Sequence, residues 1–333
     1  MSPLMDTNVV CASVGIDVAK ATLDVVVHLA EQRSHRVFAN TAAGCAALHC
    51  WLAALPAQQV RICLEATGSY SDALADYLYT HGYLLSVLNP AVLVAYRKSE
   101  QVHSKTDKLD AELLARSAQE KQPRLWHPLP ADVLALRHLV RYRADVLPML
   151  GQERTRLAAN RLTDWSRAQI QQHVTHLHQL LLAAERQLKA HLKASEQLAP
   201  LWLRLQTIPG IGWVTAAFLL ALLGDVARFP RGGALVSLAG LALKQHDSGS
   251  SLHRRACIDR QGHGELRQLL YWCAITAMRT DPQFQAFAQR LRERGKPTKV
   301  IIVAVMRKLL HIVSGVWKSQ SDSDPSKVLG PVG

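Results

Sequence analysis

Residues 12–29, ASVGIDVAKATLDVVVHL, decide the fold of the first third of this 333-residue chain. They contain two runs rich in β-branched residues, joined by a short turn at Ala19–Lys20, and a third such run follows at 34–38. Helical and strand patterns then alternate, with a helix at 41–54, a strand at 60–66, a helix at 69–81 and a strand at 83–89. A β-meander followed by this alternation predicts an α/β domain over residues 10–122, with a sheet whose inner strands are parallel.

Strand patterns almost vanish after Pro123. Residues 123–199 are predicted to form a basic helical arm, coiled-coil-like in character, with seven arginines between Arg137 and Arg167. Residues 200–318 predict a mainly α C-terminal domain, and the composition of residues 319–333 predicts a flexible tail. The arginines of the arm have an alternative interpretation as an ordinary solvated helix face.

Charge is distributed unevenly along the chain. The hydrophobic fraction of 49% excludes wholesale disorder, and the net charge is +13 at pH 7. Residues 1–122 hold 10 basic and 12 acidic side chains, whereas the rest of the chain holds 29 and 14. The second part therefore favours a polyanionic partner, either nucleic acid or an anionic membrane surface.

Cysteine usage and hydropathy indicate a soluble protein of the reducing cytoplasm. The six cysteines include no C-x-x-C pair, so the sequence supports neither a disulfide framework nor a zinc site. The longest apolar stretch identified, residues 213–223, is shorter than the ~20 residues of a membrane span, and the N-terminus has no apolar leader. No membrane association is expected.

Four acids of the first domain have positions that allow them to converge. Asp17 ends the first strand run, Glu65 ends the run at 60–64, and Asp107 and Asp110 lie one turn apart at the start of a helical pattern. Carboxylates suit Mg²⁺, and metal ions held in this way assist phosphodiester chemistry. The alternative is that Asp107 caps its helix and Asp110 is merely exposed, whereas an unpaired acid such as Asp17 is expensive to bury in an apolar strand.

Six motifs in order carry a family resemblance: GIDVAKATLDV at 15–25, LEATGSY at 64–70, KTDKLDAELLA at 105–115, and the stretches 205–229, 238–251 and 258–271. Together they resemble the DEDD transposases of the insertion-sequence "one-ten" family, including the Piv-type invertases. The resemblance implies a RuvC-like first domain with a ribonuclease H fold. It also implies that Asp17, Glu65, Asp107 and Asp110 bind Mg²⁺, with Mn²⁺ as a possible substitute.

The resemblance assigns the nucleophile to Ser248 in QHDSGSS, where a bare SG dipeptide would otherwise indicate an ordinary polar loop. Ser250 or Ser251 is the alternative register, and His246 and His253 are weaker candidates for helping the serine. The motif departs from the family pattern in having Leu243 in place of a common proline and Asp247 before the serine. Basic residues around it would suit phosphate contacts: Lys244, Arg254, Arg255, Arg260 and Arg267.

The turn Ile208-Pro-Gly-Ile-Gly212 is similar to the hairpin of a helix-hairpin-helix element, although an ordinary interhelical turn is the alternative. The resemblance as a whole implies a transposase that cuts and rejoins donor and target DNA through a covalent phosphoserine. It further implies a noncoding bridge RNA as guide, a homo-oligomer (dimer or tetramer) with active sites shared between subunits, and a bacterial cytoplasmic location, at the nucleoid when acting. Three other classes remain open: a hydrolytic RuvC-like nuclease, a non-catalytic nucleic-acid-binding scaffold and, less suited to the basic second half, an actin-like kinase.

Overall fold

The computed structural model of the chain describes residues 10–100, 106–159, 161–225, 229–244, 247–248, 252–253, 257–259 and 262–330. The chain divides into two compact units, residues 1–128 and 129–333. The division lies a few residues beyond the expected end of the first domain at 122, and the helical arm belongs to the second unit.

The first unit is built on a five-stranded sheet with strand order β3-β2-β1-β4-β5. Strands β1 (Cys11–Val18), β2 (Thr22–Leu29) and β3 (Gln32–Ala39) form the expected antiparallel meander. Strands β4 (Gln59–Glu65) and β5 (Leu84–Leu88) continue the sheet in parallel with β1. The prediction of an α/β sheet is confirmed, but its inner strands are not all parallel, because β2 is antiparallel to both of its neighbours.

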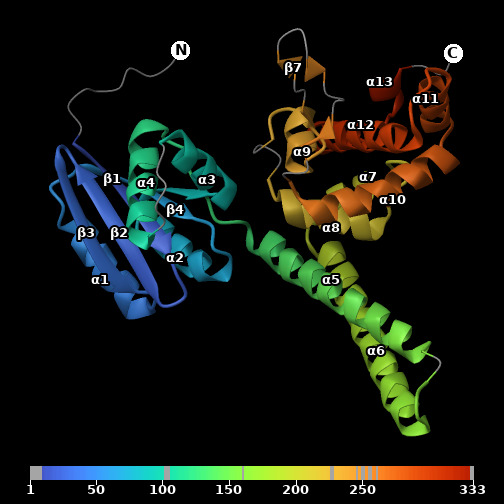
Figure 1. Cartoon of the computed structure of the whole chain (residues 1–333), viewed down its shortest axis with the longest axis horizontal. Helices are drawn as coiled ribbons and strands as arrows, with labels where there is room; N and C mark the ends of the chain where they lie inside the picture. The colour runs from blue at the N-terminus through green and yellow to red at the C-terminus, as the bar shows by residue number, and fades with distance from the viewer. Residues whose placement is uncertain are drawn as a thin grey trace. The chain divides into compact units, whose positions relative to one another are not determined.

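Helices cover both faces of this sheet, which is why its central strands are apolar on both sides. Helices α1 (Ala42–Ala53) and α2 (Ser69–Thr80) pack with the even-numbered residues of β1, such as Val14 and Ile16. Helix α4 (Asp107–Glu120) lies across β1, β2 and β4 on the opposite face, beside α3 (Pro90–Ser99) (Figure 1).

The second unit is mostly helical, as predicted. Its core gathers around α12 (Thr298–Ser319), which packs against α7 (Leu198–Leu205), α9 (Gly232–Leu238), α10 (Gly264–Thr280) and α11 (Pro282–Glu293). Helix α8 (Trp213–Leu223) contributes seven buried residues to the same core. Four two-residue strands complete the unit: β6 (Leu243–Lys244), β7 (Asp247–Ser248), β8 (Leu252–His253) and β9 (Cys257–Ile258).

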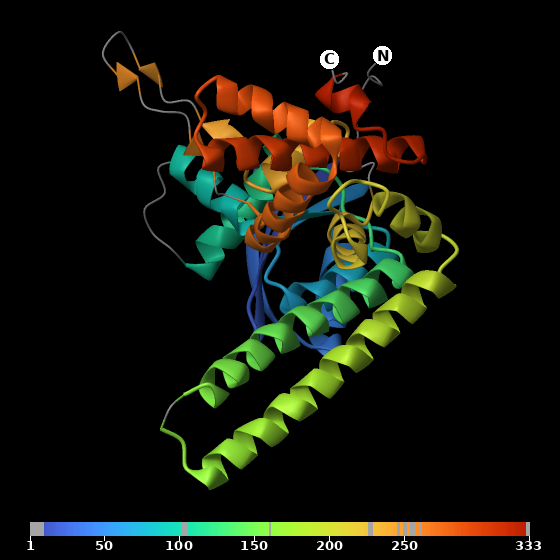
Figure 2. The ribbon, with the colours of Figure 1, turned by 90° about the vertical axis from the view of Figure 1, so that its right-hand side faces the viewer.

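The basic arm consists of two long helices, α5 (Ala131–Leu157) and α6 (Asp164–Ala194), which lie side by side along their length (Figure 2). Val146 and Leu150 of α5 meet Leu177 and Leu181 of α6 in a small apolar core. At the other end of the pair, the Ser195 hydroxyl donates to an Asp132 carboxylate oxygen at 2.6 Å. The two helices are therefore antiparallel and joined by a short connection.

Two features of the second unit differ from what the sequence predicts. Helix α12, and not residues 213–223, is the longest apolar helix described, and by length and composition it could cross a membrane. However, 61% of its most apolar window is buried inside the protein, as in the core helix of a globular unit. A short helix, α13 (Ser326–Leu329), lies within the segment predicted as a flexible tail, and Leu329 is buried against the core.

Candidate functional site

Asp17 and Glu65 lie at the carboxyl ends of adjacent parallel strands, on the same face of the sheet. Gly15 of β1 pairs with Cys63 of β4, and Ile16 pairs with Leu64, so Asp17 and Glu65 come next in the register. Side chains alternate between the two faces of a strand, and Cys63 belongs to the apolar cluster under α3 and α4. Both acids therefore face the side of the sheet that α4 covers.

Gly15 brings α4 unusually close to β1. A Cβ atom at this position would lie 1.9 Å from the Ala111 carbonyl oxygen and 2.3 Å from the Ala115 nitrogen. Any side chain at position 15 would therefore push the helix away from the strand. The glycine sits two residues before Asp17, and Ala111 directly follows Asp110, so this close approach brings the two acids to the same place.

The first turn of α4 supplies the other two acids. Thr106 is the N-cap, and its hydroxyl accepts a hydrogen bond from the Leu109 amide at 3.3 Å. Asp107 is exposed, whereas Asp110 has only 4% of its surface exposed. The alternative interpretation, a capping Asp107 and an exposed Asp110, is therefore wrong on both counts.

The four acids, which we call the acid edge (Asp17, Glu65, Asp107 and Asp110), act on one another electrostatically. The pKa of Asp17 is raised from 3.8 to about 6, first by burial and then by the charges of Asp107, Asp110 and Glu65. A smaller contribution comes from Asp24, which is directly opposite Asp17 on β2. The three other acids therefore lie near enough to Asp17 for their charges to act on it.

Two residues near the acid edge were missed by the sequence analysis. Arg97, in the last turn of α3, forms an ion pair with Asp110. Asp24 adds a fifth carboxylate, which lies 3.0 Å from Nε2 of His35. Asn89 followed by Pro90 is a helix start signal that could have predicted α3, and the short turn between β1 and β2 could have placed Asp24 opposite Asp17.

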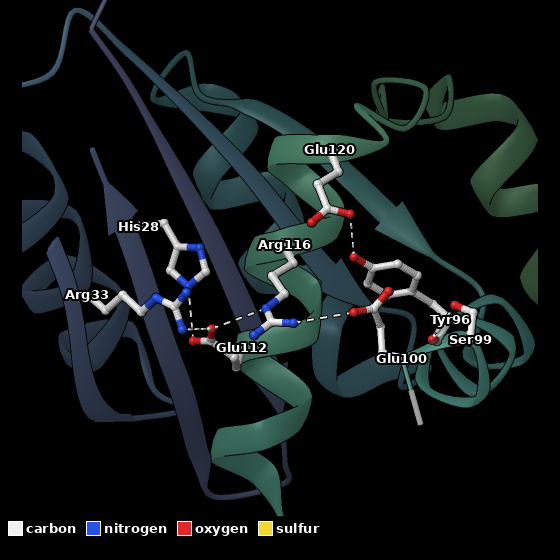
Figure 3. A network of polar contacts seen from close by, with 8 residues as sticks. All are labelled: His28, Arg33, Tyr96, Ser99, Glu100, Glu112, Arg116 and Glu120. Carbon is white, nitrogen blue, oxygen red and sulfur yellow. Dashed lines mark hydrogen bonds and ion pairs between the residues drawn. The ribbon is translucent and has the colours of Figure 1, made fainter. Parts of the chain in front are cut away.

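A second group of polar contacts fixes α4 to its neighbours (Figure 3). The Glu112 carboxylate accepts from Arg33 at 2.9 Å and contacts Nε2 of the buried His28 at 3.0 Å. Arg116 connects Glu112, at 3.5 Å, to Glu100 of the α3 C-cap, at 3.4 Å. These contacts tie α4 to β2, to β3 and to the end of α3, and we call them the Glu112 network.

The donor set of the acid edge fits a hard divalent cation. Its members are carboxylates, which Mg²⁺ and Mn²⁺ prefer, and the raised pKa of Asp17 reflects burial together with a local excess of negative charge that a cation would relieve. Among the described residues, no three His, Cys, Asp or Glu side chains are grouped closely enough to hold an ion as they stand. The acid edge therefore has the chemistry of a metal site without a closed coordination shell.

Ser248 lies in the second unit, in strand β7, which pairs with β8 through Ser248 and Leu252. The structure describes the strand but not the environment of the serine side chain. Six other candidate residues lie outside the described part of the chain: Ser250, Ser251, His246, Arg254, Arg255 and Arg260. For His253 and Lys244, only the placement in a strand is described. The assignment of the nucleophile stays a prediction.

Two conspicuous features of the second unit have structural roles. Gly210 has φ +83°, and a Cβ there would lie 2.3 Å from the Cys273 carbonyl oxygen, so this glycine lets the turn pack on α10. Arg267, expected near phosphate, donates to the carbonyl oxygens of Ala239 at 3.0 Å and Gly262 at 3.1 Å.

Comparison with known proteins identifies the class. A family model described as "Transposase" matches residues 14–164, and a second, described as "Transposase IS116/IS110/IS902 family", matches residues 203–289. The matched ranges contain the acid edge and Ser248, respectively. These matches define an enzyme of the transposase and DNA-recombinase class.

Relatives extend the similarity over nearly the whole chain. A pilin gene-inverting protein of Moraxella lacunata is 34% identical over 314 residues, which is 93% of this chain and 97% of that protein. Its counterpart in Moraxella bovis matches equally well, at 34% over 314 residues. A transposase for insertion sequence element IS1111A of Coxiella burnetii is 37% identical over 95 residues, covering 28% of this chain and 25% of that protein. The chain belongs to the IS116/IS110/IS902 family of transposases, which confirms the resemblance seen in the sequence motifs.

Proposed function

We propose that the chain is a site-specific DNA recombinase that moves an insertion sequence by exchanging strands between donor and target DNA. The acid edge holds Mg²⁺, or Mn²⁺ in its place, and Ser248 forms a covalent bond to a DNA end. The observation that carries the proposal is the convergence of Asp17, Glu65, Asp107 and Asp110 on one edge of the sheet, within a chain 34% identical to a protein named for inverting a gene.

The topology of the first unit supports a ribonuclease H-like, RuvC-like assignment. An antiparallel meander is followed by two parallel strands, in the order β3-β2-β1-β4-β5. The first acid lies on the central strand β1, and the second lies on its parallel neighbour β4. Functional groups in open α/β sheets gather at the carboxyl ends of such strands. This placement favours a catalytic role over a structural role for the acids.

The chemistry divides between the two units. Bound metal would supply Lewis-acid stabilisation of the charge that develops on the phosphate oxygens. The Ser248 hydroxyl oxygen attacks phosphorus, a serine–phosphate ester forms, and the bond to the leaving strand breaks. The proton lost from the serine hydroxyl is balanced by one gained at the hydroxyl of the leaving strand. Attack by a second strand's hydroxyl on the ester reverses these steps and needs no high-energy cofactor.

The partners follow from the same proposal. The second part of the chain, with 29 basic and 14 acidic side chains after residue 122, suits a large polyanion. We expect the bound polyanions to be the two DNAs and a noncoding bridge RNA. We expect the enzyme to work in the bacterial cytoplasm, at the nucleoid. The active enzyme is a dimer or tetramer in which the acid edge of one subunit serves Ser248 of another.

The decisive experiment locates a DNA adduct on the protein. The reaction is stopped with denaturant, the protein is digested, and the DNA-modified peptide is identified by mass spectrometry. We expect the adduct on Ser248 and its loss in Ser248→Ala, with metal and DNA binding retained. Ser250→Ala and Ser251→Ala are the matched controls, and both should keep much of the activity.

Other outcomes separate the alternatives. An adduct on Ser250 or Ser251 would move the nucleophile by two or three residues. Cleavage without any adduct would favour a hydrolytic nuclease, and binding without cleavage would favour a scaffold. Sequencing of RNA that copurifies with the chain tests the guide, since an RNA encoded beside the gene should be enriched. Mixing Ser248→Ala with Asp17→Asn subunits tests shared sites, since mixed oligomers should regain activity.

A further inference from the structure

Arg97 is a basic residue that contacts the acid edge. One of its terminal nitrogens, Nη2, is paired with an Asp110 carboxylate oxygen. The two side chains are 17% and 5% exposed, so the pair lies largely out of water. Arg97 comes from the last turn of α3 and Asp110 from the first turn of α4, so the ion pair connects two helices that are consecutive in the chain.

This ion pair is poorly satisfied for a structural contact. The Nε atom of Arg97 is buried and has no hydrogen-bond partner among the described residues. An arginine that serves only to fasten two elements usually uses several donors, because an unused buried donor costs about 1–3 kcal/mol. Arg143 in the basic arm illustrates the usual case, since its Nε and a terminal nitrogen both lie 2.9 Å from the Glu185 carboxylate.

The electrostatic setting explains why a cation is present here at all. Asp110 is almost fully buried, and it lies among acids whose charges already raise the pKa of Asp17. Without a counter-ion, a buried Asp110 carboxylate would be strongly destabilising. Arg97 therefore occupies, in electrostatic terms, the place of a metal ion at this carboxylate.

We propose that Arg97 is an exchangeable counter-ion of the acid edge. It pairs with Asp110 in the metal-free enzyme and releases this carboxylate when a divalent cation binds. Its donors, including the free Nε, then contact a phosphate oxygen of the DNA strand. This inference rests on the metal site proposed above, and it makes Arg97 a positioning residue that couples metal binding to DNA binding.

The first test measures metal affinity without DNA. Mn²⁺ is titrated calorimetrically into the full-length protein and into Arg97→Gln, Arg97→Lys and Arg116→Gln. We expect Arg97→Gln to bind Mn²⁺ roughly 10-fold more tightly, since the competing charge is gone, which corresponds to about 1.4 kcal/mol. Arg97→Lys keeps the charge and should stay near the wild-type affinity. Arg116→Gln removes a cation of the Glu112 network instead and should also leave the affinity unchanged.

Asp17→Asn separates failure of this inference from failure of the metal site. If Asp17→Asn loses Mn²⁺ binding while Arg97→Gln binds as the wild type does, the metal site stands and the counter-ion role of Arg97 is wrong. If the wild type and Asp17→Asn bind Mn²⁺ equally weakly, the metal site and the inference fail together. Thermal unfolding provides the check on folding: Arg97→Gln should unfold at a lower temperature without metal and recover with saturating Mn²⁺.

The second test measures the coupling to DNA. Affinity for a DNA duplex is determined across a salt series, with Ca²⁺ and then with EDTA. We expect Arg97→Gln to weaken binding and to reduce the slope of log K against log salt by about 1 with Ca²⁺, which is the loss of one phosphate contact. In EDTA the variant and the wild type should have the same slope. Equal slopes in both conditions would show that Arg97 does not reach the phosphate.

Discussion

The acid edge and the Glu112 network both include residues of α4, yet their electrostatics are opposite. Around Glu112, burial would raise its pKa, but hydrogen bonding with His28 and the charges of His28, Arg33 and Arg116 lower the pKa below its ordinary value. Around Asp17, burial and acidic neighbours all act in one direction and raise the pKa to about 6. An acid that holds a fold together is surrounded by cations, whereas Asp17 is surrounded by acids whose charges a bound cation would offset.

The largest expected effect is on DNA strand cleavage, which should depend on the acid edge and not on the Glu112 network. Asp17→Asn should reduce DNA strand cleavage by about 10³-fold or more, because loss of a metal ligand removes several kcal/mol of transition-state stabilisation. Glu112→Gln, the matched control on the fixed side of α4, should keep activity within about 10-fold. DNA binding should survive in both variants, since the basic surface is intact. Wild-type cleavage in EDTA would contradict the metal assignment.

Gly15 connects the two regions, because it sets the distance between α4 and β1. Gly15→Ala should lower the free energy of unfolding by about 1–3 kcal/mol, since the new Cβ meets the Ala111 carbonyl oxygen at 1.9 Å. Cleavage should fall further than stability alone explains, as Asp110 moves away from Asp17. Gly151→Ala in α5 is the control, because, apart from its own helix backbone, no atom of the described residues lies within 4 Å of its added Cβ. Unchanged metal affinity in Gly15→Ala would show that the acid edge tolerates a displaced helix.

This glycine also shows where prediction from sequence stops. The strands and the helix start at Asp107 follow from local patterns and are present in the structure, and the charges of Glu65, Asp107 and Asp110 act on Asp17. The close approach of Gly15 to Ala111 joins residues far apart in the chain, so no local pattern reveals it. Arg97 was missed for the same reason, although Asn89 and Pro90 mark the start of its helix.

The second unit shows the same limit of prediction from local sequence. The sequence 319–333 has the composition of a flexible segment, yet α13 lies within it. Lys308 donates to the Val328 carbonyl oxygen at 2.8 Å, and Arg290 donates to the Leu329 carbonyl oxygen at 3.1 Å. A four-residue helix held by distant side chains has too little local signal to be predicted.

Asp17 and Glu112 should also change stability in opposite directions in the metal-free protein. An Asp17 pKa raised from 3.8 to about 6 means that folding is progressively disfavoured as pH rises through that interval. The lowered pKa of Glu112 means that its stabilisation is present above about pH 4.5 and is lost as pH falls through its folded-state pKa. At pH 7 in EDTA, Asp17→Asn should raise and Glu112→Gln should lower the free energy of unfolding, each by about 1 kcal/mol after allowance for solvent screening. Denaturant unfolding measures both, and shifts of the same sign would contradict the comparison.

The smallest expected effect concerns the basic arm, where the same distinction between paired and unpaired charge applies. Arg143 is paired with Glu185 between α5 and α6, whereas Arg154 and Arg161 are exposed and have no ion pair among the described contacts. Neutralising Arg154 and Arg161 to Gln should reduce the slope of log K against log salt for DNA binding by about 1 per lost phosphate contact, with the unfolding temperature unchanged. Arg143→Gln should instead lower the unfolding temperature and leave the slope nearly intact, because its charge is already used within the arm. A slope that does not respond to Arg154 and Arg161 would assign them to an ordinary solvated helix face, and the polyanion would then contact the protein through other basic residues.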